Sequence, residues 1–171
     1  MLMSRSIRKL ALTAHITVSG GLLGAIAGFL ALSVAGLVSQ DLQLVRSAYL
    51  AMGLVATLVI VPLALAALGT GVIQSLGTPW GLLRHYWVIA KLALTTFATI
   101  VLLVKMQMIG EVARFAQTAV LAPGDLHHQR LELAVHAAAG LVVLLMPMAL
   151  SVYKPWGPTQ FGPRKLRERS V

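Results

Sequence analysis

The chain has 171 residues, of which 58% are hydrophobic and 11% charged, and its mean hydropathy is +0.85. A soluble domain normally carries about 25% charged residues, so this composition excludes an ordinary soluble protein and indicates a membrane protein. The chain contains no cysteine, which excludes disulfides, thiolate metal sites, iron–sulfur clusters and cysteine nucleophiles. At about 20 apolar residues for each crossing, the length allows about four spans and leaves no room for a separate soluble catalytic domain.

Four apolar stretches predict transmembrane helices at about residues 10–38, 48–75, 87–109 and 133–153. The first stretch is about twice the length of the apolar region of a secretory signal, which favours a retained span over a cleaved leader. Residues 1–153 are therefore expected to form a single all-α membrane domain, a four-helix bundle. Residues 154–171 have no apolar period and are expected to form a disordered basic tail near anionic headgroups.

The net charge of +9 is distributed unevenly over the two predicted sides of the membrane. Four spans place both termini on one side, and that side carries ten basic residues and one acid, whereas the other side carries four of each. Basic residues concentrate on the cytoplasmic side of membrane proteins, so the N- and C-termini are expected to be cytoplasmic. This distribution explains the basic charge without nucleic acid, and anionic lipid headgroups are the expected cytoplasmic partner.

Histidines inside a membrane are functional candidates, because ionisable groups are costly in lipid. The predicted topology places His15 and His85 near the cytoplasmic side, and His136 near the outer side with His127 and His128. Neutral imidazole can ligate haem b or copper, which makes either group a candidate ligand pair. Structural or interfacial histidines are the simpler interpretation, because no spaced metal motif is present.

Small residues recur on the first predicted helix, where Gly20, Gly24 and Gly28 are spaced by four. Such a stripe lets a second helix approach closely, either within the bundle or from a second copy of the chain. At 100° for each residue, Gly24 points to the side of the helix opposite His15. If His15 faces the bundle interior, the stripe faces outward and a homodimer, or contact with a partner membrane complex, becomes more attractive.

The cations near the cytoplasmic ends of the spans include Arg84, Lys91 and Lys154. For Lys91 the simplest interpretation is a lysine that snorkels toward the surface near Trp87, and the alternative is binding of an anionic headgroup or substrate. All five acids lie outside the predicted spans, which argues against a carboxylate-driven transporter. No nucleophile elbow, phosphate loop, zinc-protease motif or paired carboxylate is present, so no catalytic activity is expected.

Two stretches carry a resemblance, residues 76–92 (LGTPWGLLRHYWVIAKL) and residues 150–162 (LSVYKPWGPTQFG). Together with Thr13 and His15 they resemble a group of four-span integral membrane proteins common in actinobacteria and some other bacteria. In that group the tail often carries arginine at the position of Trp156, so the chain departs from the pattern there. The resemblance implies the fold and a bacterial plasma membrane location, and it implies no activity.

Three functions are consistent with these patterns. The leading hypothesis is a structural or accessory membrane module that packs with itself or with a partner complex. The second is a haem b or copper electron carrier that uses the intramembrane histidines. The third is a minor transporter or lipid-binding protein that works through the basic residues from Arg84 to Lys91.

Overall fold

The fold was analysed in a computed structural model that describes residues 3–77, 81–118, 126–153, Pro155, Gly157 and Thr159. The helices are α1 (Arg5–Val38), α2 (Leu42–Val55), the π-helical segment η1 (Ala56–Ile60), α3 (Val61–Gly77), α4 (Tyr86–Thr118) and α5 (His127–Tyr153). Because α2, η1 and α3 continue one another, they form a single long element from Leu42 to Gly77. The all-α four-helix bundle expected from the sequence is confirmed.

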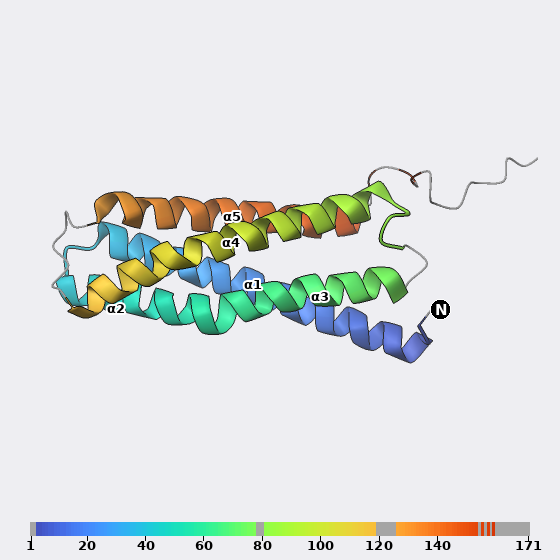
Figure 1. Cartoon of the computed structure of the whole chain (residues 1–171), viewed down its shortest axis with the longest axis horizontal. Helices are drawn as coiled ribbons and strands as arrows, with labels where there is room; N and C mark the ends of the chain where they lie inside the picture. The colour runs from blue at the N-terminus through green and yellow to red at the C-terminus, as the bar shows by residue number, and fades with distance from the viewer. Residues whose placement is uncertain are drawn as a thin grey trace, which may run out of the picture.

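All four long elements are apolar and long enough to cross a membrane, with 27 to 36 residues each. They run up and down in turn, so α1 and α4 begin at the end of the bundle where α3 and α5 finish (Figure 1). We call this the basic end, because Arg5, Arg8 and Lys9 lie there, and we call the opposite end the far end. Large apolar side chains are exposed along every span, as expected for a surface that lipid covers. The chain is a multi-pass membrane protein.

Local signals explain where several helices begin. The Asp41 side chain caps α2 by accepting hydrogen bonds from the backbone N–H groups of Gln43, at 2.9 Å, and Leu44, at 3.4 Å. Ser4 caps α1 in the same way, because its hydroxyl accepts from the N–H of Ile7. These side chains satisfy donors that the first turn of a helix leaves without partners.

The helix boundaries differ from the predicted spans mainly at the far end. The third span was expected to finish near residue 109, with the helix continuing or lying along the interface, and α4 continues to Thr118. The fourth span was expected from residue 133, and α5 begins at His127. Polar residues therefore extend both helices by about two turns beyond their apolar parts.

The two prolines within the spans act differently. Pro62 has no N–H to donate to the carbonyl of Leu58. The π segment ends two residues before Pro62, and the N–H of Val61 donates to the carbonyl of Ala56. The helix therefore continues through Pro62 with a wider turn. Pro147 is buried inside α5, and its own carbonyl accepts a hydrogen bond from the Ser151 hydroxyl at 2.9 Å.

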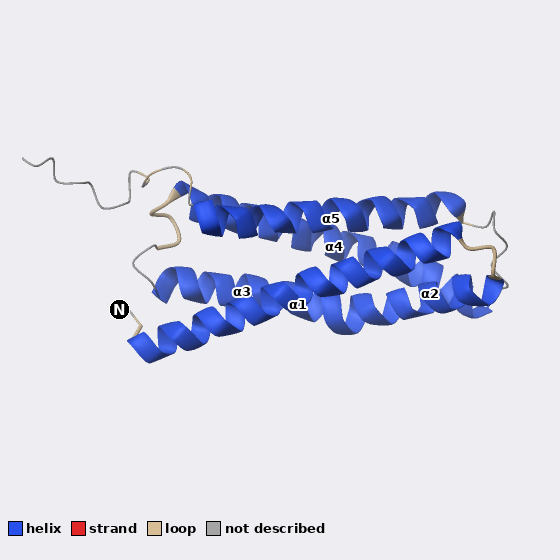
Figure 2. Cartoon of the chain, turned by 180° about the vertical axis from the view of Figure 1, so that it is seen from behind, coloured by secondary structure: helices blue, strands red, loops and turns tan. Residues whose placement is uncertain are grey.

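The core of the bundle lies in the middle and far half of the molecule. Its buried side chains follow a helical period along α2, η1 and α3 and are met by residues of α1, α4 and α5. Close approach depends on small residues: a Cβ on Gly36 would lie 2.8 Å from the ring of Tyr49, and one on Gly53 would lie 2.9 Å from Cβ of Ala113. Seen from behind, α1 with α3 separates from α4 with α5 toward the basic end (Figure 2).

Candidate functional site

A cavity of about 860 Å³ lies between the two helix pairs in the basic half of the bundle. All four spans contribute to it, through α1, α3, α4 and α5. Polar side chains line its outer part: Arg8, Lys9, His15, Gln74, Ser75 and Lys91. Its inner wall is apolar and includes Leu22, Ala67, Leu68 and Leu144. Its size falls within the range of ligand pockets, and its lining is amphipathic.

Lys91 projects from the second turn of α4 into this cavity. Its Nζ donates a hydrogen bond to Oγ of Ser151 on α5, at 2.5 Å, and lies 5.6 Å from the centre of the Trp87 ring. The expected neighbourhood of Trp87 is confirmed, and both partners lie nearer the basic end than Lys91 itself, since Ser151 is in the last turn of α5 and Trp87 is in the first turn of α4. The ammonium group therefore lies between α4 and α5 at the border of the cavity, with Ser151 and the Trp87 face as its partners.

His15 faces the same cavity from α1. Its Nδ1 lies 2.9 Å from Oγ1 of Thr70 on α3, and the Thr70 hydroxyl lies 2.7 Å from the carbonyl of Ala66. If the hydroxyl proton goes to that carbonyl, Thr70 accepts from Nδ1–H, and Nε2 is left as the second polar atom of the imidazole. Gly71 gives the ring its space, since a Cβ there would lie 3.3 Å from Cε1 of His15.

The fixed charges around the cavity are all positive. Arg8, Lys9 and Lys91 line it, and no Asp or Glu does so among the residues that the structure describes. Lys91 and His15 are half-buried and already hold hydroxyl groups rather than carboxylates. An anion in the cavity would therefore meet several donors and no opposing negative charge from the described lining.

The other cations expected on this side lie elsewhere. Arg84 is exposed and its side chain covers Gly81, which has a positive φ of 61°. Its carbonyl accepts a hydrogen bond from the N–H of Thr159 at 2.9 Å, and the Thr159 hydroxyl donates to the carbonyl of Leu83. Thr159 is buried, so at this residue the tail packs on the segment before α4. Lys154 and most of the tail, with its expected disorder, lie outside the described residues.

The histidines do not gather at one place. His85 is half-buried, its ring centre lies 6.2 Å from that of Trp87, and it is not part of the cavity lining that includes His15. At the far end, His127 and His128 are exposed in the first turn of α5. His136 is half-buried and its Nδ1 donates to the carbonyl of Glu132 at 2.8 Å. Within the described parts of the chain, no three His, Asp or Glu side chains lie close enough together to hold a metal ion.

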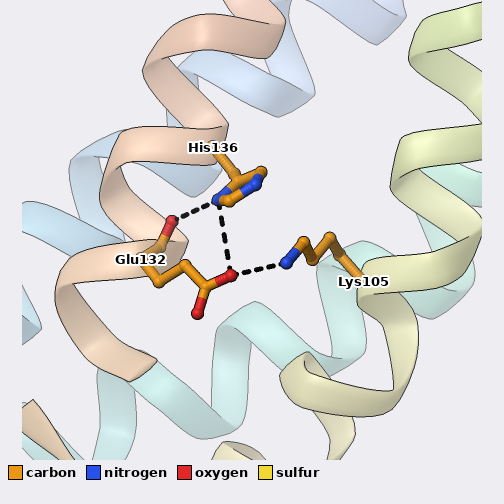
Figure 3. A network of polar contacts seen from close by, with 3 residues as sticks. All are labelled: Lys105, Glu132 and His136. Carbon is orange, nitrogen blue, oxygen red and sulfur yellow. Dashed lines mark hydrogen bonds and ion pairs between the residues drawn. The ribbon is translucent and has the colours of Figure 1, made fainter. Parts of the chain in front are cut away.

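A polar network links α4 and α5 toward the far end (Figure 3). Nζ of Lys105 lies 2.5 Å from Oε1 of Glu132, and the same oxygen lies 4.0 Å from Nδ1 of His136. Both members of the closer pair are partly exposed, at 29% for Lys105 and 28% for Glu132. The His136 imidazole is thus held against Glu132, one turn earlier on α5, and Glu132 in turn contacts α4.

The glycine stripe of α1 is exposed, and Gly20 at its basic end borders the cavity. Gly20, Gly24 and Gly28 are exposed, and a Cβ on any of them would meet nothing within 4 Å. His15 faces inward, so the expected opposition between His15 and Gly24 is confirmed. The stripe therefore has no part in packing within the described chain, and Gly28 borders a shallow apolar groove between α1 and η1.

Sequence reasoning missed the most buried charged side chain. Arg130 is only 1% exposed, and its guanidinium donates to the Tyr49 hydroxyl at 3.1 Å and to the carbonyl of Gly36. It also lies over the Tyr49 ring, 5.3 Å from the centre. The charge count assigns Arg130 to the outer side of the membrane and does not address its burial. The signal in the sequence is its position just before the fourth apolar stretch, and the contact with Tyr49 has no signal there.

None of the family models, curated proteins and solved structures compared with the chain matches it.

Proposed function

We propose that the protein binds an anionic amphiphile in the cavity at its basic end. The observation that carries this proposal is the convergence of Lys91, Arg8, Lys9 and His15 on one cavity whose inner wall is apolar. This develops the lipid-binding hypothesis, which named the basic residues from Arg84 to Lys91, and centres the binding on Lys91. Catalysis forms no part of the proposal.

The physical argument concerns where the charges lie. An exposed lysine in water gains little from an anion, but Lys91 is half-buried among apolar helices, where the effective dielectric is lower and charge pairs are stronger. A hydrogen bond to a charged group contributes about 1.5–3 kcal/mol. An apolar chain attached to the anion would cover the inner wall and add hydrophobic stabilisation. A ligand with both parts fits the lining better than an inorganic ion or a neutral hydrocarbon.

The direct test compares laurate with 1-dodecanol, which has the same chain length without the charge. Titration calorimetry of the full chain in a non-ionic detergent should show saturable binding of laurate and weaker binding of dodecanol. Lys91→Met should weaken laurate binding by about tenfold, the equivalent of 1.4 kcal/mol, and Lys91→Arg should restore much of it. Arg5→Gln is the control, because Arg5 is exposed at the same end and does not line the cavity.

A second candidate function is the accessory module that assembles through α1. It is favoured by the exposure of Gly20, Gly24 and Gly28, because these glycines leave a flat helix face that nothing in the described chain covers. Gly24→Ile should then reduce cross-linking between copies in membranes. Unchanged cross-linking in Gly24→Ile would remove the homodimer, while an undisturbed laurate affinity in this variant would show that the two functions are independent.

The membrane placement belongs to the same proposal. We place the chain in a bacterial plasma membrane with both termini in the cytoplasm, which brings the cavity to the inner leaflet. The support is the excess of basic residues at the end where α1 begins and α5 finishes. Anionic lipids of that leaflet would then be the nearest source of ligand.

A further inference from the structure

The walls of the cavity differ in the exposed fraction of their lining residues. On the α3 and α4 side, the lining residues are buried or half-buried, with Trp87 at 8% and Val88 at 6% exposure. On the α1 and α5 side, four apolar lining residues are strongly exposed: Leu12, Ile16, Met148 and Val152. The cavity is therefore better covered on its α3 and α4 side and is most exposed between α1 and α5.

The opening has an apolar border, which is suited to face the hydrocarbon of the bilayer as well as the water at the basic end. Leu12 and Ile16 are one turn apart on α1, and Met148 and Val152 are one turn apart on α5. These are membrane-spanning helices, so an apolar border on both is suited to contact with acyl chains. We call the gap bordered by Leu12, Ile16, Met148 and Val152 the lateral portal. The divergence of α1 from α5 toward the basic end agrees with this position (Figure 2).

The order of polar and apolar groups along the bundle matches one orientation of a lipid. Arg8 and Lys9 lie in the first turns of α1, and Lys91 lies in the second turn of α4. The apolar wall formed by Leu22, Leu68 and Leu144 lies nearer the middle of the helices. A lipid from the leaflet at the basic end already holds its headgroup toward this end and its chains toward the bilayer centre.

We infer that the ligand is an anionic membrane lipid that enters sideways through the lateral portal, with its headgroup at Lys91. This inference rests on the proposed function and names its ligand class and its route. The shared chemistry is a carboxylate or phosphate group, and the apolar border selects a bilayer lipid over a free anion from water. The headgroup would replace water around the Lys91 ammonium while Ser151 keeps the lysine directed into the cavity.

Trp87 offers a reporter, because it lines the cavity and is almost fully buried. Brominated acyl chains quench tryptophan on contact, so the full chain with Trp80→Phe and Trp156→Phe would be placed in nanodiscs. These would contain phosphatidylcholine and a few per cent of either dibromo-phosphatidylglycerol or dibromo-phosphatidylcholine. The anionic brominated lipid should quench Trp87 at least threefold more than the zwitterionic one. Lys91→Met should abolish this preference and Lys91→Arg should retain it.

Matched variants test the route. Ile16→Phe with Met148→Phe narrows the portal and should reduce the anionic preference at least threefold. Leu10→Phe with Val142→Phe adds the same rings to the same helices, at exposed positions that do not line the cavity, and should leave the preference unchanged. Thermal unfolding of each variant in detergent establishes that it is folded before it is compared.

Three results would overturn the inference. Equal effects of the portal pair and the control pair would exclude the lateral route. Equal quenching by the two brominated lipids would exclude headgroup selection, and loss of quenching on addition of millimolar inorganic phosphate would assign the site to a soluble anion. Laurate titration in detergent separates this inference from the proposed function. Saturable, Lys91-dependent laurate binding with no lipid preference in nanodiscs overturns the assignment of the ligand as an anionic membrane lipid and leaves the proposed function standing, whereas no laurate binding overturns the proposed function.

Discussion

Individual residues in this bundle are fixed by polar contacts that the apolar helices could not specify alone. Arg130 joins three spans through the Gly36 carbonyl and the Tyr49 hydroxyl, and Lys91 joins α4 to α5 through Ser151. The two cations differ in their surroundings: Arg130 is closely packed at the far end, whereas Lys91 borders a cavity. Removing Arg130 should therefore affect folding, and removing Lys91 should affect binding.

Glycine substitutions distinguish packing faces of α1. In Gly36→Ala the new methyl group would lie 2.8 Å from the Tyr49 ring, so we expect a loss of about 1–3 kcal/mol in the free energy of unfolding. Gly24→Ala is the matched control, because its methyl group meets nothing within 4 Å, and it should not destabilise the bundle. Reversible unfolding in mixed detergent measures both. Equal effects would contradict the packing of α1 against α2.

A change at Gly71 tests how the cavity holds His15. The methyl group of Gly71→Ala would lie 3.3 Å from Cε1 of the imidazole, so the ring must shift and its hydrogen bond to Thr70 should weaken. The ¹⁵N chemical shifts of the imidazole should change, while those of the exposed His127 should not. An unshifted His15 resonance would contradict the contact between α1 and α3.

At the scale of elements, each span combines an apolar body with a polar contact near one end. The start of α5 shows this arrangement: Arg130 is directed toward α1 and α2, and Glu132 toward Lys105 of α4. The long element from Leu42 to Gly77 contributes most of the core, and its π segment accommodates Pro62. The far half is closely packed, and the cavity lies in the basic half, where the helix pairs separate.

The contacts at the start of α5 predict that substitution of Arg130 strongly lowers the free energy of unfolding. In Arg130→Met the Tyr49 hydroxyl and the Gly36 carbonyl lose a donor, and we expect about 1–3 kcal/mol of destabilisation. Arg114→Met removes an exposed arginine of α4 and should have little effect. Unfolding in mixed detergent would again be measured. A smaller effect for Arg130→Met than for Arg114→Met would contradict the assignment of Arg130 as the link between three spans.

Sequence patterns predicted the helices better than the rotation of each helix about its own axis, which decides the side chains that face the core. The four spans, the common side of both termini and the opposition of His15 to Gly24 follow from length, parity and helical geometry. The contact of Lys91 with Ser151 at the cavity could not be predicted in this way, because lipid-facing and core-facing residues are equally apolar and leave no periodic signal. The Thr70 and Gly71 contacts with His15 were missed for the same reason. The burial of Arg130 was also missed, because the positive-inside rule assigns a charge to one side of the membrane and does not predict whether it is buried.

At the scale of the whole molecule, the bundle is divided into a packed far half and an open basic half. Among the residues that the structure describes, Arg5, Arg8, Lys9, Arg84 and Lys91 lie at the open half with no acid beside them, so net positive charge and cavity coincide. The inner-leaflet orientation that we propose from the distribution of basic residues would give an anionic lipid direct access to Lys91.

The orientation can be tested by labelling, because the chain contains no cysteine. Ser4→Cys at the basic end should be protected from a membrane-impermeant maleimide added outside intact cells. Gln40→Cys, exposed between α1 and α2 at the far end, should react. Permeabilised cells should label both variants, which serves as the control. Labelling of Ser4→Cys alone in intact cells would reverse the proposed orientation.

The most direct test of anion binding at Lys91 is the ratio of laurate to dodecanol affinity in the wild type and in Lys91→Met. We predict that the wild type favours laurate and that Lys91→Met lowers this ratio about tenfold, with Arg5→Gln unchanged. A ratio that is the same in the wild type and in Lys91→Met would contradict the proposal that this cavity binds an anionic amphiphile.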